Sequence, residues 1–154
     1  MLKKLMIAVS LLVLGVFAAE AKDLVLLDLN FLGEGSIKLE SKLPPGVFAN
    51  ASRMTKSGRK AYPYYIDLGK TLSLELKVRI VGGDGQLSPS LYAFRKEKGQ
   101  KGQAISITCK NFEFNDEECN RVPCVISKWQ SMMSRNVHDG DVITIKVEFE
   151  KPEE

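Results

Sequence analysis

A stretch of strict alternation between apolar and polar residues limits what this chain can fold into. From Thr71 to Ile80, every second residue is Leu, Val or Ile, and the residues between them are Thr, Ser, Glu, Lys or Arg. Successive side chains of a β-strand point to opposite faces of a sheet, so the pattern predicts a strand with one buried and one solvated face. The run ends at Gly82-Gly83-Asp84-Gly85, whose glycines favour a turn.

The same alternation recurs along the chain. Residues 143–149 repeat it clearly, and residues 25–31 repeat it near the start. In the strand near the start, Leu24 and Leu26 make the second face apolar as well, so we expect the first half of this strand to be covered on both sides. Further strands are predicted at residues 37–39, 62–68, 87–95, 104–114 and 122–129, and residues 127–135 have the spacing of a short helix or turn.

Many short strands separated by Gly, Pro, Asn and Asp, with little helical periodicity, predict an all-β fold. We expect a two-sheet antiparallel β-sandwich, with a jelly roll as the favoured arrangement. An immunoglobulin domain is not favoured, because its order of Cys, central Trp and Cys is absent. No repeat or linker divides the sequence, so residues 22–154 are expected to form a single domain.

Residues 1–21 have the layout of a secretory signal peptide. Lys3 and Lys4 precede an apolar run over residues 5–19, and Ala19-Glu20-Ala21 has the small-x-small form of a cleavage site. The run is shorter than the roughly 20 residues of a membrane-spanning helix. We therefore expect residues 22–154 to be exported to the periplasm or the extracellular space, without membrane insertion of the mature chain.

The charge pattern bears on the class of partner. The formal net charge is +3, and lysines and acids are interspersed along the chain. The densest basic cluster, residues 95–101, is interrupted by Glu97 and is interpreted as a solvated loop. This pattern does not favour a nucleic-acid partner. A glycan or an envelope protein is expected instead, and the oligomeric state stays open.

The three cysteines leave two pairings open. In an oxidising compartment Cys119 and Cys124 could close a small loop, and this is the favoured disulfide. Cys109, which alternates with apolar neighbours, could instead pair with Cys124 across a hairpin. The spacing of the cysteines and the single histidine, His138, matches no zinc pattern, so no metal site is assigned to them.

No catalytic motif stands out. A Ser-His-acid or Cys-His set would depend on His138, which lies in a turn sequence. A hydrolase using two carboxylates is the less favoured alternative, because most acids on the predicted strands fall on outward faces. No cofactor is expected. The turn residues Asp84, Asp116, Asp139 and Asp141 are the side chains that could hold Ca²⁺, although turn formation is the simpler role for each.

Aromatic residues are the best candidates for a binding site. Tyr and Trp rings can stack on the apolar face of a sugar with little loss of rotamer entropy, and their polar edges tolerate water. The candidates for ligand binding are Trp129, Tyr62, Tyr65 and Tyr92, with Arg79 as a donor of hydrogen bonds. The competing role for Trp129 is packing in the core beside Met132 and Met133.

The organisation of the chain resembles the galactose-binding-like jelly-roll modules of secreted bacterial proteins. Residues 65–74 resemble the strand that enters a long central strand in such modules, residues 82–87 resemble the following turn, and residues 139–145 are similar to the closing strand. The resemblance implies a non-catalytic binding module, with carbohydrate as the leading ligand. The alternative is a structural or protein-interaction domain of the cell envelope. The resemblance assigns no individual binding residue.

Overall fold

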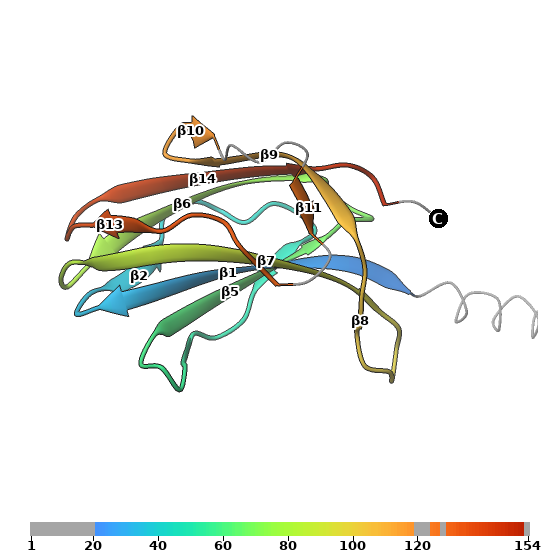
Figure 1. Ribbon diagram of the computed structural model, residues 1–154, viewed down its shortest axis with the longest axis horizontal. Coiled ribbons are helices and arrows are strands. Elements are labelled where there is room, and N and C mark those ends of the chain that lie inside the picture. Colours follow the sequence, from blue (N-terminus) through green and yellow to red (C-terminus); the bar gives the residue numbers. More distant parts are fainter. Residues whose placement is uncertain (1–20, 119–123, 127–128, 153–154) are drawn as a thin grey trace, which may run out of the picture.

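Two antiparallel sheets lie face to face in the computed structural model, which describes residues 21–118, 124–126 and 129–152 (Figure 1). The first sheet has eight described strands, with β1 at its centre between β5 and β7. The short strands β3 and β4 pair with β5, while β8, β12 and β13 pair with β7. The strands of this sheet are β1 (Lys22–Gly33), β3 (Val47–Ala49), β4 (Arg53–Met54), β5 (Lys60–Asp67), β7 (Gly85–Lys96), β8 (Gln103–Ala104), β12 (Gln130–Ser131) and β13 (Arg135–Val137).

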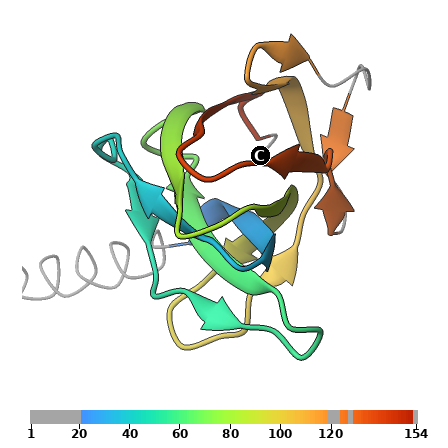
Figure 2. The ribbon, with the colours of Figure 1, turned by 90° about the vertical axis from the view of Figure 1, so that its left-hand side faces the viewer.

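The second sheet has six described strands and is centred on β14, which lies between β6 and β9. Strand β2 pairs with β6, and β10 and β11 pair with β9. The strands of this sheet are β2 (Ser36–Leu39), β6 (Ser73–Val81), β9 (Ile107–Phe114), β10 (Glu117–Glu118), β11 (Cys124–Ile126) and β14 (Val142–Phe149). Seen from the end of the molecule, the two sheets enclose a common interior (Figure 2).

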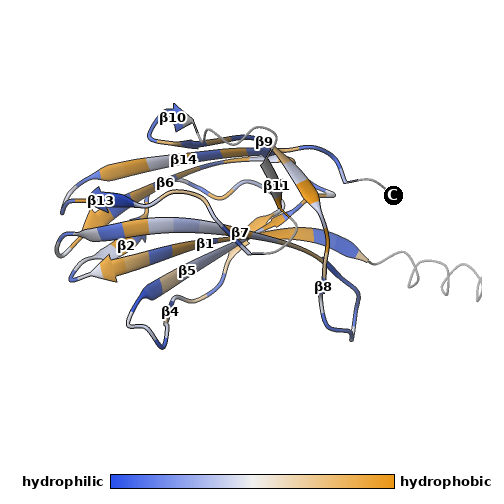
Figure 3. Cartoon of the chain, viewed as in Figure 1, coloured by the Kyte–Doolittle hydropathy of each residue, from blue (hydrophilic) through white to orange (hydrophobic). Residues whose placement is uncertain are grey.

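The core is made of the alternate apolar residues that face this interior. In β6, Leu74, Leu76, Val78 and Ile80 are buried, as the alternation predicted. Hydrophobic and hydrophilic residues alternate along the strands in Figure 3. The largest fully buried side chains come from both sheets, as a two-layer sandwich requires. They include Leu27, Leu29, Phe31, Ile66, Leu87 and Leu91 from the first sheet and Leu76, Ile80, Ile126, Ile145 and Phe149 from the second.

The β-sandwich predicted from the sequence is confirmed, but the narrower expectation of a jelly roll is not. The first strand, β1, is central in one sheet and the last strand, β14, is central in the other. Among the described residues of the segment 127–135, the short strands β12 and β13 occur in place of the helix that the spacing allowed. The predicted signal peptide lies outside the described residues, except for Ala21.

Both faces of β1 are covered in its first half, as its apolar pattern predicted. Val25, Leu27, Leu29 and Phe31 face the core and are fully buried. On the opposite, outer face Leu24 and Leu26 are also buried. Their neighbours on this outer face include Tyr65, Tyr92 and Phe94, which belong to the candidate site.

Candidate functional site

Five aromatic side chains gather on the outer face of the first sheet. We call them the aromatic row: Phe48, Tyr65, Tyr92, Phe94 and Trp129. Strand pairing brings them together, because Tyr65 of β5 and Tyr92 of β7 both lie opposite Leu26 of β1. Phe48 of β3 lies opposite Tyr65, and Trp129 directly precedes β12, which pairs with β7.

The rings of the aromatic row contact one another in sequence. Trp129 stacks on Tyr92 with ring centroids 5.1 Å apart, and Tyr92 stacks on Phe94 at 5.8 Å. Phe94 meets the edge of Tyr65 at 6.3 Å, and Tyr65 stacks on Phe48 at 5.1 Å. Such contacts hold aromatic side chains in defined positions, so the row is a preformed surface.

The two ends of the row are its most exposed parts. Trp129 is 51% exposed and Phe48 is 47% exposed, whereas the three rings between them are half-buried. Each end ring takes part in one ring contact among the described residues, and that contact occupies only one of its faces. About half of the surface of Trp129 and of Phe48 is therefore open to contact with a flat, partly apolar ligand.

A row of polar residues lies next to the aromatic row on the same outer face. We call it the polar row: Asp28 and Asn30 of β1, Ser88 and Ser90 of β7, and Arg53 of β4. Asp28 lies opposite Ser90 and Asn30 lies opposite Ser88 in the β1–β7 ladder. The Asn30 amide Nδ2 donates to the Ser90 hydroxyl and to the Ser88 carbonyl, both at 3.3 Å.

Asp28 has an unusual environment for a carboxylate. The residue is only 4% exposed, and its Oδ1 is fully buried without a hydrogen-bond partner among the described residues. Its Oδ2 lies 3.8 Å from Nη2 of Arg53, which is an ion-pair distance but too long for a hydrogen bond. Burial raises the pKa of Asp28, and the Arg53 charge opposes this shift.

Three of the predicted ligand-binding residues, Trp129, Tyr65 and Tyr92, are brought together in the aromatic row. The other two are elsewhere. Tyr62 faces the core side of β5, where its hydroxyl accepts a hydrogen bond from the Ile37 amide at 3.1 Å. Arg79 lies on β6 of the second sheet, where it forms an ion pair with Glu40 and donates to the Gly140 carbonyl at 3.3 Å.

Of the four acids considered for calcium, Asp84, Asp139 and Asp141 accept hydrogen bonds from turn amides, and Asp116 lies 4.0 Å from Lys146. The Asp84 carboxylate accepts a hydrogen bond from the Asp139 amide at 2.8 Å, and this bond lowers the pKa of Asp84, with a further contribution from His138. The Asp141 carboxylate accepts from the His138 amide at 2.8 Å, and His138 itself is exposed. In the described part of the chain, no group of three or more His, Cys, Asp or Glu residues is placed to hold a metal ion.

The predicted disulfide of Cys119 with Cys124 falls partly outside the described residues, because Cys119 is not among them. The backbone of Cys124 in β11 is described, and its Cα pairs with that of Cys109 in β9. Cys109 is buried. The strand register therefore brings together the other pair that the sequence left open.

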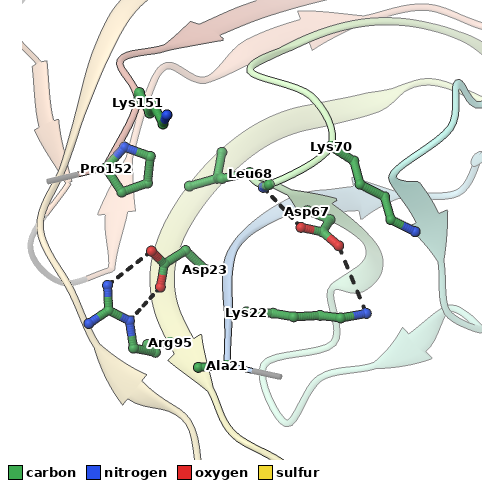
Figure 4. A pocket seen from close by; sticks show the side chains of 10 residues that line it. Ala21, Lys22, Asp23, Asp67, Leu68, Lys70, Arg95, Lys151 and Pro152 are labelled. Carbon is green, nitrogen blue, oxygen red and sulfur yellow. Dashed lines mark hydrogen bonds and ion pairs between the residues drawn. The ribbon is translucent and has the colours of Figure 1, made fainter. Parts of the chain in front are cut away.

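A cavity of about 380 Å³ lies at the end of the sandwich where β1 begins (Figure 4). Arg95 donates two hydrogen bonds to the Asp23 carboxylate, at 2.7 and 3.0 Å, and Lys22 lies 3.9 Å from Asp67. The lining combines charges of both signs with no aromatic ring. Since both acids are engaged with cations of the cavity itself, we consider the outer face of the first sheet the better candidate site.

Sequence reasoning missed Phe48, Phe94 and the whole polar row. A signal for Asp28 is present in the sequence, because a single acid interrupts the apolar run from Leu24 to Leu29. A charged residue in a strand that is apolar on both faces indicates either a structural ion pair or a binding site. The serines and Phe48 lack such a signal, because their place depends on pairing between distant strands.

Comparisons with known proteins give no guide to this site: no family model, curated protein or solved structure matches the chain. The described residues also contain no helix with the length and apolar character needed to cross a membrane.

Proposed function

We propose that the protein is an exported, non-catalytic binding module whose leading ligand class is carbohydrate. The observation that supports this proposal is the aromatic row, with a half-exposed ring at each end and a polar row beside it. Apolar ring faces and hydroxyl-binding groups are the two elements that a sugar-binding surface needs. Trp129 and Phe48 are the rings that would stack on the sugar.

The arrangement of the two rows favours binding over hydrolysis. Cleavage of a glycosidic bond usually requires two carboxyl groups held roughly 5 to 9 Å apart. Asp28 is the one carboxyl group among the ten residues of the two rows. Within the two rows a sugar would therefore meet a single acid, which suits recognition.

Binding of purified protein to a glycan array, followed by calorimetric titration, tests the proposal. We expect Trp129→Ala to weaken binding at least about tenfold, because stacking on this ring is lost. Val142→Ala is the matched control, since Val142 is an exposed apolar residue on the other sheet. The proposal is wrong if no glycan binds, or if both variants bind like the unaltered protein.

The second candidate function is a structural or protein-interaction role in the cell envelope. The aromatic row also favours it, because the rings at its two ends, Phe48 and Trp129, are about half exposed. Contiguous apolar surfaces are typical of protein contacts. A protein that binds no sugar but self-associates, with Phe48→Ala abolishing the association and Val142→Ala preserving it, would support this function instead.

A further inference from the structure

We propose that the ligand of the outer face is an acidic polysaccharide, whose anionic groups bind three cations beside the Phe48 end of the aromatic row. We call these cations the basic hairpin: Arg53 lies in β4, and Lys56 and Arg59 lie in the turn that joins β4 to β5. This inference rests on the proposed function, because it concerns the same sheet face. It adds the chemical class of the sugar.

The chain segment that carries the basic hairpin contains no acid. Between Glu40 and Asp67 the sequence has five Lys or Arg residues and no Asp or Glu, and no other stretch of the chain without an acid is as long. Two of the five cations are placed elsewhere, because Lys60 donates to the Gly35 carbonyl and Lys42 lies outside the hairpin. The other three give this part of the surface an excess of positive charge.

The three cations of the basic hairpin are open to a ligand. Lys56 is exposed and Arg59 is half-buried, and within the described part of the chain neither side chain forms a hydrogen bond or an ion pair. Arg53 is 62% exposed, and its Nη2 lies too far from Asp28 for a hydrogen bond. Asp28 offsets at most one of the three positive charges, and burial raises its pKa, which weakens that offset.

The backbone of the turn holds these cations in a defined place. The Thr55 amide donates to the Arg59 carbonyl at 2.7 Å, and the Arg59 amide donates to the Thr55 hydroxyl at 3.0 Å. The Gly58 amide donates to the Thr55 carbonyl at 3.0 Å, and Gly58 has a φ of 83°, which glycine adopts without strain. The turn is therefore closed before a ligand binds, so binding does not have to order its backbone.

The basic hairpin continues the aromatic row along the edge of the first sheet. Phe48 lies opposite Tyr65, and Arg53 lies opposite Ala61 on the same face of β5. Residues four apart in a strand are separated by about 14 Å. The Arg53 side chain shortens this distance, because it reaches Asp28, which lies opposite the residue midway between Ala61 and Tyr65. An extended sugar chain that stacks on Phe48 can therefore place an anionic group at Arg53 and a later one at the turn.

The chemistry of the three cations favours carboxylate or sulfate groups on the ligand. A guanidinium binds such groups through two parallel hydrogen bonds, and charge-assisted hydrogen bonds are stronger than those between neutral groups. An anionic lipid surface would also attract the cations, and Met54 of the same hairpin is 63% exposed. One aliphatic side chain offers little apolar area for insertion into lipid, whereas the aromatic row offers a stacking surface beside the cations. The arrangement therefore favours an acidic sugar chain.

The experiment measures binding by calorimetry to two matched pairs of sugars and to lipid vesicles. Pentagalacturonic acid is compared with its methyl ester, and dextran sulfate with dextran, so that the members of each pair share a backbone and differ in charge. Vesicles of phosphatidylglycerol are the lipid probe. The hairpin variant combines Lys56→Gln with Arg59→Gln. The control variant combines Lys38→Gln with Lys77→Gln, which removes two positive charges from exposed lysines of the second sheet. Melting curves confirm that each variant is folded.

We expect the acidic member of at least one pair to bind about tenfold or more tightly than its uncharged partner. The pair that binds shows whether the anionic group is a carboxylate or a sulfate. The hairpin variant should weaken binding of the acidic sugar about tenfold, whereas the control variant should change it less than about twofold, because charges on the far sheet are screened. Sodium chloride should weaken binding of the acidic member alone.

The inference on charge is overturned, and the proposed function stands, if both members of a pair bind equally and Trp129→Ala weakens them while the hairpin variant does not. Binding of neutral glycans alone on the array has the same meaning. Equal losses in the hairpin and control variants also overturn the inference, because net charge would then explain the binding. Binding of vesicles in place of both acidic sugars overturns it in favour of a lipid surface. Absence of binding to every sugar probe and to the glycan array overturns both proposals.

Discussion

Arg53 and Asp28 form an ion pair in which one partner is solvated and the other is buried. The Arg53 side chain is 62% exposed, and its Nη2 lies 3.8 Å from Oδ2 of Asp28. A solvated guanidinium at this distance compensates little of the cost of burying a carboxylate, because water screens the attraction. Folding therefore favours the protonated form of the Asp28 carboxyl, in agreement with the raised pKa of this group.

We predict that Asp28→Asn stabilises the protein at neutral pH by about 1 kcal/mol, the scale of one poorly satisfied buried polar group. Because the folded pKa of Asp28 lies above the unfolded value of 3.8, its carboxyl favours folding most below pH 3.8 and loses that contribution as pH rises through the folded pKa. The gain from Asp28→Asn should thus be larger at pH 7 than near pH 3.5. Urea unfolding at both pH values measures it.

Asp116→Asn is the control, because it removes the same charge from an exposed carboxyl. The free energy of unfolding of this variant should differ from that of the unaltered protein by less than about 0.5 kcal/mol. The free energy of unfolding of each variant must be compared with that of the unaltered protein at the same pH. Other acids shift in the opposite direction, since hydrogen bonds lower the pKa of Glu40 and Asp84. A loss of stability in Asp28→Asn at pH 7, or a gain that is the same at both pH values, would contradict this account of Asp28.

Trp129 is the single tryptophan of the chain, so its fluorescence reports on one end of the aromatic row. With half of its surface exposed, we expect acrylamide to quench its emission readily in the folded protein. A sugar that stacks on the ring should reduce this quenching. A blue-shifted emission that acrylamide barely quenches in the absence of sugar would show a buried ring and would remove the stacking surface.

Much of the fold could be predicted from side-chain alternation alone. The strict pattern of residues 71–80 predicted which face of β6 is buried, because apolar and polar residues must alternate in a strand that packs on one side only. The two apolar faces of β1 likewise indicated cover on both sides. The sheet order could not be predicted in this way, because alternation says which side of a strand is buried and not which strand lies beside it.

The candidate site was only partly predictable for the same reason. Tyr65 and Tyr62 lie three residues apart in β5, and alternation places them on opposite faces, but only the sheet order shows which face carries other rings. Trp129 has helical spacing from Met132 and Met133, yet the local structure is extended, so the tryptophan lies outside while the methionines pack against the core. Asp28 meets Ser90 and Arg53 only through strand pairing.

A close approach of backbone at Gly35 gives a prediction about stability. A Cβ at Gly35 would lie 2.1 Å from the carbonyl oxygen of Gly83, so the two segments would have to separate. We expect Gly35→Ala to lower the free energy of unfolding by about 2 kcal/mol, as overpacking does. Gly69→Ala is the matched control, because its Cβ would meet only the Asp67 side chain, at 3.3 Å. Equal stability of the two variants in urea unfolding would contradict the approach of these segments.

The last prediction concerns the pairing of the cysteines. Residues directly opposite in an antiparallel ladder have Cα atoms about 4.5 to 5.5 Å apart, which lies within the range of about 4.4 to 6.8 Å found for disulfides. Cys109 and Cys124 are opposite each other in the β9–β11 ladder, so we expect them to form the disulfide when the protein folds with oxidised glutathione. Closing a loop of roughly 15 residues should stabilise the fold by up to about 3 kcal/mol.

Peptide mapping by mass spectrometry under non-reducing conditions identifies the pair directly. Cys124→Ser should abolish the disulfide and lower the stability of the oxidised protein. Cys119→Ser should change neither the disulfide nor the stability, because Cys119 takes no part in the expected pair. The register of β11 on β9 would be contradicted by a disulfide that joins Cys119 to Cys124. It would be contradicted equally if Cys119→Ser removed the stability gained on oxidation.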